Sequence, residues 1–259
     1  MNRRLLAFTN LLGFIITIIL NALANALPIN GQTTGELSDA YPNLFVPAGL
    51  TFAIWSLIYL LLLIFVVYGL VAAFSKNQSQ SVFLEKIGWW FFISCLCNAS
   101  WIVAWHYEIV PLSLMIMLGI LGSLIMIYRR LGIGTGNGGS REKFLVHMAF
   151  SIYLGWITVA TIANVTTLLV DNGIDGGGSA ALFAASVIVV AIVMGSLFLK
   201  NRGDLFYALV VVWALYGIYL KRSRLDAEAW NLITITAVAG MVLLLIGGLL
   251  VLGQRKLYR

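Results

Sequence analysis

The chain has 259 residues, of which 61% are hydrophobic and only 10% are charged, and its formal net charge is +6. A soluble domain carries about 25% charged residues because its surface must be solvated, so this composition excludes a soluble enzyme. The positive charge does not indicate nucleic-acid binding, because Lys and Arg stand in short clusters between long apolar blocks, as membrane orientation requires.

Apolar runs of about twenty residues predict transmembrane helices, because a spanning β-barrel would instead show alternating apolar and polar residues. The predicted fold class is therefore all-α, a polytopic transmembrane helical bundle of about eight helices, with seven as the alternative. The eight predicted segments cover about residues 5–27, 45–74, 87–105, 109–128, 144–170, 179–199, 205–220 and 230–253.

The first segment has two interpretations. Arg3 and Arg4, an apolar stretch and Ala24-Asn25-Ala26 together fit a signal peptide. The apolar run over 5–27 is long for a signal sequence and has the right length for a span. We therefore expect it to be retained as the first helix.

Two connecting segments stand out by composition. Loop one, Pro28–Asn43, has no Lys or Arg and carries Glu36 and Asp39. The segment Leu131–Ser140 is rich in glycine, which is typical of a flexible linker.

The seventh segment is the weakest candidate, because it is short for a full span. With the N-terminus inside, thirteen of the 16 Lys and Arg residues lie inside and three, Lys221, Arg222 and Arg224, lie outside. If the seventh segment does not span, these three residues lie inside and the three basic residues of the C-terminus lie outside, so the count is again thirteen against three. Charge therefore orients the first six helices and leaves seven or eight spans open.

Several patterns that suggest chemistry have simpler explanations. The glycines of residues 134–139 fit GxGxxG, but that fingerprint binds dinucleotides only between a strand and a helix. His106 and His147 lie near helix ends without a second metal ligand one turn away, so we expect interfacial histidines and no metal site. No Lys, Asp or Glu lies in the middle of a span. That absence argues against a Schiff-base cofactor, a proton-coupled pump and ordinary acid–base catalysis.

Three predicted helices carry aromatic residues and a small or amide residue at spacings of three and four, which places them on one face. Such faces can line a flat apolar pocket with a few polar anchors, or can be ordinary helix packing, and spacing alone favours packing. The three sets are Phe52, Trp55 and Tyr59; Asn98, Trp101 and Trp105; and Trp156, Ala160 and Asn164.

These helices resemble the TspO/MBR family of tryptophan-rich sensory proteins, also called translocator proteins. Residues 46–59, VPAGLTFAIWSLIY, are similar to the family's PPGxxFxxxWxxLY signature. Residues 98–101, NASW, resemble its NxxW segment, and residues 153–164, YLGWITVATIAN, resemble its PYLxWxxxAxxLN segment. The chain departs from these patterns in having one proline, Pro47, where the family has two, and Ile152 where the family has proline.

The resemblance covers about residues 1–170 and implies a five-helix bundle with a ligand pocket, closed by loop one as a lid. Residues 171–259 are expected to add helices that pack in the same domain. The family binds tetrapyrroles such as protoporphyrin, which implies a possible porphyrin ligand but no required cofactor. The ligand-binding residues implied by the resemblance are Phe52, Trp55, Tyr59, Asn98, Trp101, Trp156, Ala160 and Asn164.

We therefore expect a membrane binding or sensory protein with an intramembrane aromatic pocket for a hydrophobic ligand. Two alternatives stay open: a transporter or permease-type subunit for a small neutral or amphiphilic solute, and an enzyme acting on a membrane-embedded substrate such as a porphyrin. The expected location is the cytoplasmic membrane of a bacterium, with the N-terminus inside. The expected partners are membrane lipid, the hydrophobic ligand and a second copy in a homodimer, without nucleic acid.

Overall fold

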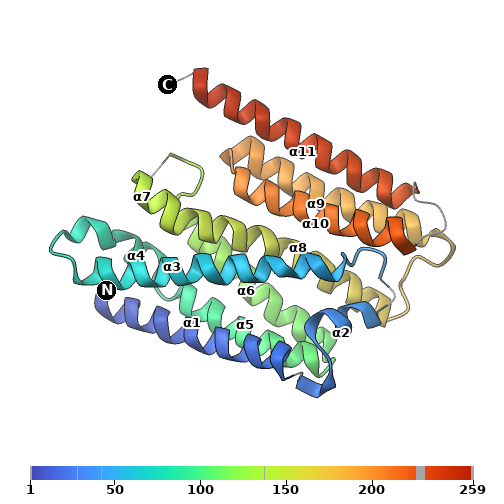
Figure 1. Ribbon diagram of the computed structural model, residues 1–259, viewed down its shortest axis with the longest axis horizontal. Coiled ribbons are helices and arrows are strands. Elements are labelled where there is room, and N and C mark those ends of the chain that lie inside the picture. The colour runs from blue at the N-terminus through green and yellow to red at the C-terminus, as the bar shows by residue number, and fades with distance from the viewer. Residues whose placement is uncertain (1, 28, 42, 137, 226–230, 258–259) are drawn as a thin grey trace. The chain divides into compact units, whose positions relative to one another are not determined.

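The computed structural model describes residues 2–27, 29–41, 43–136, 138–225 and 231–257 (Figure 1). In these ranges the regular structure is helical, and no residue is in a strand. The long helices are α1 (Arg3–Ala26), α3 (Ile54–Phe74), α5 (Trp90–His106), α6 (Val110–Leu131), α8 (Met148–Asp171), α9 (Ala180–Arg202), α10 (Leu205–Leu225) and α11 (Leu232–Leu257). The short helices are η1 (Ile29–Gly31), α2 (Thr34–Ala40), η2 (Gly49–Ala53), η3 (Gln78–Ser81), α4 (Val82–Ile87), α7 (Ser140–Glu142), η4 (Lys143–His147) and η5 (Gly177–Ser179).

Within the described part of the chain, seven helical stretches are long and apolar enough to cross a membrane. An eighth span forms if the pair Gln78–Ile87 and Trp90–His106, bent by 49°, counts as one. The chain is thus a polytopic helical membrane protein. The seventh predicted segment, the weakest by sequence, forms the 21-residue helix α10. The irregular segment is the bent pair of α4 and α5.

Gly88 lies at the break between α4 and α5. Its backbone has φ 59° and ψ −135°, a conformation open to glycine and strained for other residues. The Gly88 amide still donates to the Leu84 carbonyl at 2.8 Å, which closes α4. The chain then restarts as α5 at Trp90. The apolar composition of residues 87–105 does not show this break, because one backbone angle decides it.

Contacts between Cα atoms divide the chain into two compact units. Unit 1 contains residues 1–34 and 54–157, and unit 2 contains residues 35–53 and 158–259. The chain passes from one unit to the other within loop one, at the start of α3 and in the middle of α8. Residue 170, the expected end of the five-helix part, lies in the last turn of α8 and belongs to unit 2.

In unit 1, α1 lies against α5 and α3, and α5 lies against α6 (Figure 1). A small residue brings α1 and α5 together: a Cβ on Gly13 would lie 2.9 Å from the Phe92 ring and 3.1 Å from the Cys95 Cβ. Small residues at such crossings let the helix backbones approach closely in a membrane. The first segment thus forms a packed helix of this unit.

In unit 2, α9, α10 and α11 lie side by side (Figure 1). Glycines again stand at the crossings. A Cβ on Gly195 of α9 would lie 3.0 Å from a Leu244 methyl group, and one on Gly240 of α11 would clash with an Ile192 methyl group. Many large apolar side chains on α11 are exposed, for example Leu249 at 68%. This outer surface suits contact with lipid rather than water.

Candidate functional site

An aromatic cluster on α3 and α8 contains three of the residues predicted to bind ligand. Trp55 and Tyr59 lie one turn apart on α3 and stack, with ring centroids 5.4 Å apart and planes 22° apart. Trp55 also meets two rings of α8 edge-on, Tyr153 at 6.0 Å and Trp156 at 6.3 Å. The four rings all belong to unit 1. The cluster thus forms from two helices about a hundred residues apart in sequence.

Asn98 connects this cluster to α1 through buried hydrogen bonds. The Asn98 amide donates to the Tyr153 hydroxyl at 3.1 Å, and the Asn98 side-chain carbonyl accepts from the Asn21 amide at 2.8 Å. Asn21 also donates to the Thr17 carbonyl at 2.9 Å. A buried amide must find partners because water cannot reach it. Neither Asn21 nor Tyr153 was among the predicted site residues, although Tyr153 is the first residue of the YLGWITVATIAN segment.

Trp101 lies one turn beyond Asn98 on α5. Its ring stacks on Trp105, with centroids 5.9 Å apart and planes 15° apart. Trp101 is 5% exposed, and its indole Nε1 has no hydrogen-bond partner. An indole N–H is a donor only, so the predicted site holds an unused buried donor beside Asn98.

The two histidines lie near helix ends, and both are buried in the protein. His106 is 1% exposed, and its Nδ1 is 2.7 Å from the Ile102 carbonyl. His147 is 6% exposed and pairs with Glu142, with Nε2 and Oε1 3.3 Å apart. Among the described residues, no three His, Cys, Asp or Glu side chains come close enough to hold a metal ion.

The other three predicted site residues belong to unit 2. Phe52 lies in η2, and Ala160 and Asn164 lie in the second part of α8. Asn164 is 4% exposed, and its amide donates to the Ala160 carbonyl one turn earlier at 3.2 Å. The structure therefore brings Trp55, Tyr59 and Trp156 together and joins them to Asn98 through Tyr153. Phe52, Ala160 and Asn164 belong to unit 2.

Loop one was expected to act as a lid, and its second part is bonded to helices of unit 2. Pro28 and Pro42 lie outside the described residues. Asp39 of α2 forms an ion pair with Lys221 near the end of α10. The Asn43 amide donates to the Thr166 hydroxyl at 2.7 Å. These contacts tie the segment to α10 and α8.

Residues 47–51 approach the backbone of α10 closely. The Ala48 amide donates to the Gly217 carbonyl at 3.0 Å, and the Trp213 indole donates to the Thr51 carbonyl at 2.9 Å. A Cβ on Gly217 would clash with the Thr51 hydroxyl. This contribution of α10 was not predicted, because nothing in the sequence pattern identifies the acceptor for the Trp213 indole.

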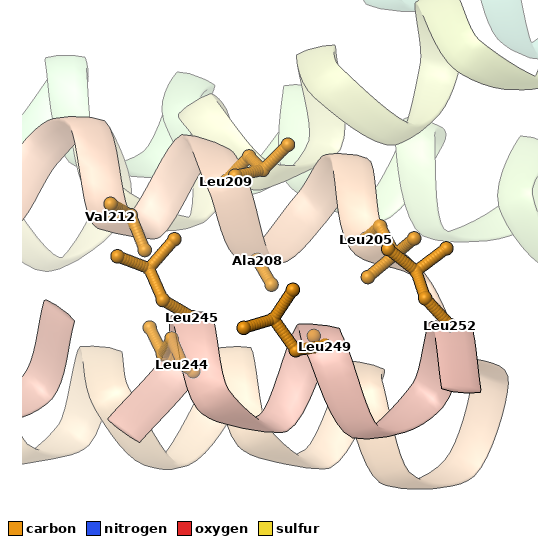
Figure 2. Close-up of a pocket in the computed structure, with 9 residues that line it drawn as sticks. Leu205, Ala208, Leu209, Val212, Leu244, Leu245, Leu249 and Leu252 are labelled. Atoms are coloured by element: carbon orange, nitrogen blue, oxygen red, sulfur yellow. The ribbon is translucent and has the colours of Figure 1, made fainter. Parts of the chain in front are cut away.

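A separate, purely aliphatic pocket of about 330 Å³ lies between α10 and α11 (Figure 2). Six leucines line it, together with Ala208, Val212 and Gly248. None of the residues predicted to bind ligand takes part. Its lining offers no ring to stack on and no side-chain donor or acceptor.

The motif-bearing helices and the buried aromatic cluster agree with a comparison against family models. A model described as TSPO-like protein matches residues 7–250. The chain belongs to the TSPO-like protein family. The match of this TSPO-like chain continues past residue 170, through α9 and α10 and into α11. No curated protein and no solved structure gives a significant match.

Proposed function

We propose that this TSPO-like protein binds a flat hydrophobic ligand at the aromatic cluster of unit 1, with tetrapyrroles as the first class to test. The observation that carries the proposal is the combination of stacked rings with buried polar groups. Trp55, Tyr59 and Trp156 supply ring faces and edges, while Asn98 and the unused Trp101 N–H supply polar anchors. Pockets for such ligands are mostly apolar, with a few placed donors and acceptors.

The chemistry of the cluster suits a large ring with polar substituents. Tryptophan and tyrosine stack on flat π-systems and also meet them edge-on. A carboxylate or carbonyl on the ligand would accept a hydrogen bond from the Trp101 indole, which has no partner of its own. Binding rather than turnover is proposed because the spans carry no Lys, Asp or Glu at their centres.

The test is a titration of the purified full chain in detergent with protoporphyrin, following both tryptophan fluorescence and the porphyrin absorption band. Trp55→Phe and Trp156→Phe are compared with the wild type. Trp89→Phe is the matched control, because Trp89 is 41% exposed and meets the Phe92 ring edge-on, away from the cluster. We expect saturable binding that weakens in the first two variants and not in the control. Equal binding in all four proteins would contradict this site.

The transport alternative has less support. Broken helices in pairs mark many transporter sites. Proline is a common cause of such breaks, and the prolines in the described part of the chain are Pro47 and Pro111. Pro47 precedes η2 and Pro111 stands in the first turn of α6, so neither interrupts a helix. The break within the described spans is at Gly88. Counterflow of a solute in vesicles, without saturable porphyrin binding, would favour transport instead.

For the topology, we propose eight spans with both termini on the inner face of a bacterial cytoplasmic membrane. Asp39 and Lys221 form an ion pair, so the end of α10 lies on the same side as loop one. An even number of spans must therefore separate them, which requires the bent pair α4–α5 to count as one span. Reporter fusions after residues 75, 139 and 257 should all report the inner side, and any outer-side result would contradict this arrangement.

A further inference from the structure

The pocket between α10 and α11 is a trough that extends along about a third of each helix. Its lining runs from Leu205 to Val212 on α10 and from Leu244 to Leu252 on α11. At a rise of 1.5 Å per residue these stretches are about 10 and 12 Å long. Half of a bilayer's hydrocarbon core is about 15 Å. The trough therefore runs parallel to the helices over roughly the depth of one leaflet.

The trough has a buried floor and an open, exposed rim. Ala208 and Leu244 in the floor are 3% and 2% exposed. Leu209 and Leu249 on the rim are 51% and 68% exposed. Figure 2 shows Leu205 and Leu252 at one end and Val212 at the other. A saturated carbon chain lying along the helices matches this shape and this aliphatic lining, whereas a flat aromatic ring does not.

One end of the trough carries basic residues. Lys200 and Arg202 lie in the last turn of α9, directly before Leu205. In the sequence, Arg255 and Lys256 follow Leu252 three and four positions later. Lys200 is exposed. The acid in this region, Asp204, is 5% exposed, and its carboxylate accepts a hydrogen bond from the Tyr207 amide. The other end of the trough lies near the middle of both helices.

We propose that this trough is a binding site for an anionic phospholipid, with one acyl chain along α10 and α11 and the headgroup at the basic end. The length of the trough fits a chain from a single leaflet, and the charge at its end complements a phosphate-containing headgroup. Basic clusters at the inner ends of spans attract anionic lipids. This site is separate from the aromatic cluster and does not depend on the proposed ligand there.

The experiment measures lipid retained by the purified full chain in native mass spectrometry, with phosphatidylglycerol and phosphatidylcholine added at equal concentration. Ala208→Leu fills the floor of the trough, and Ala181→Leu makes the same change at an exposed position of α9. The triple variant Lys200→Gln, Arg255→Gln, Lys256→Gln removes three positive charges that lie, in sequence, just outside the lining segments of the trough. Its control, Lys76→Gln, Arg141→Gln, Lys143→Gln, removes the same charge at exposed positions elsewhere in the chain.

We expect each wild-type chain to retain about one lipid molecule. The retained amount of phosphatidylglycerol should be at least fivefold larger than that of phosphatidylcholine. Ala208→Leu should reduce retention of both lipids several-fold, and the charge variant should abolish the preference between them, while both controls resemble the wild type.

Retention by the wild type without a headgroup preference would overturn the proposal, because the basic residues would then serve only to orient the protein in the membrane. Loss of a dimer mass in Ala208→Leu, with lipid unchanged, would assign the trough to a second copy instead. If Ala208→Leu does not fold, the charge variant, altered only near helix ends, still decides the outcome.

Discussion

The side-chain amide of Asn21 donates to the side-chain carbonyl of Asn98 at 2.8 Å, and this bond joins α1 to α5 across 77 positions of sequence. Asn98 is fully buried and donates its own amide hydrogen to Tyr153 of α8. One residue thereby connects three helices of unit 1. Asn21, Asn98 and Tyr153 satisfy one another where water is absent, whereas the buried Trp101 indole N–H of the same unit has no partner.

Replacing Asn98 by Leu should destabilise the protein by about 1–2 kcal/mol, because it removes the partner that Asn21 and Tyr153 share while keeping a similar volume. The measurement is the free energy of unfolding in mixed micelles. Asn172→Leu is the control, since Asn172 is exposed and its side chain bonds within its own helix end. Equal unfolding free energies for the two variants would show that the buried network contributes nothing.

Trp101→Phe should weaken binding of a carboxylated porphyrin without a comparable loss of stability. The substitution keeps a ring against Trp105 and removes an N–H that has no partner in the protein. One hydrogen bond corresponds to about 0.5–1.5 kcal/mol, or roughly 2- to 12-fold in Kd. The measurement is the same porphyrin titration, repeated with a porphyrin that lacks carboxylates. Trp101→Phe should make no difference to the second ligand, and an equal loss for both would contradict the assigned donor role.

Gly217→Ala should be strongly destabilising, by about 1–3 kcal/mol or more, because overpacking forces the neighbours to move. The added Cβ would meet the Thr51 hydroxyl and would lie 2.9 Å from the Pro47 Cβ. Thermal unfolding in detergent measures the loss. Gly122→Ala on α6 is the control, since no atom lies within 4 Å of its Cβ position. Adding Thr51→Ala should recover part of the stability, and a Gly217→Ala protein as stable as the control would contradict the close approach of η2 to α10.

The ion pair between Asp39 and Lys221 should contribute little to stability but should slow local opening of loop one. Asp39 is half exposed, so the coupling energy from a double-mutant cycle of Asp39→Asn and Lys221→Gln should stay below about 1 kcal/mol. Hydrogen exchange of residues 35–41 should accelerate in each variant, and added salt should reduce the difference from the wild type.

Arg224→Gln serves as the control for this pair, because it removes the same charge three residues later at an exposed position. Exchange over residues 35–41 that does not change in Lys221→Gln, or that changes equally in Arg224→Gln, would show that Lys221 does not hold the segment.

Part of the candidate site could be predicted because it depends on spacing within a helix. Trp55 and Tyr59 are four residues apart, so they share a face whatever surrounds them. The meeting of Trp55 with Trp156 came from the family resemblance, because no local rule brings α3 to α8. The bond from Trp213 to Thr51 was not predicted at all. Its two residues are 162 positions apart, and the chain offers many other acceptors.

The sequence by itself determined that this is a multi-pass helical membrane protein of the TSPO-like family. It could do so because a bilayer requires about twenty apolar residues per span and lets each helix satisfy its own backbone. Only the tertiary structure decided that Gly88 separates α4 from α5, that Asn98 bonds to both Asn21 and Tyr153, and that the second part of loop one is bonded to α10. Those features depend on a single backbone angle or on pairings between distant segments. A pattern of apolar residues predicts where the helices are, but it does not specify which helices meet or which polar groups pair.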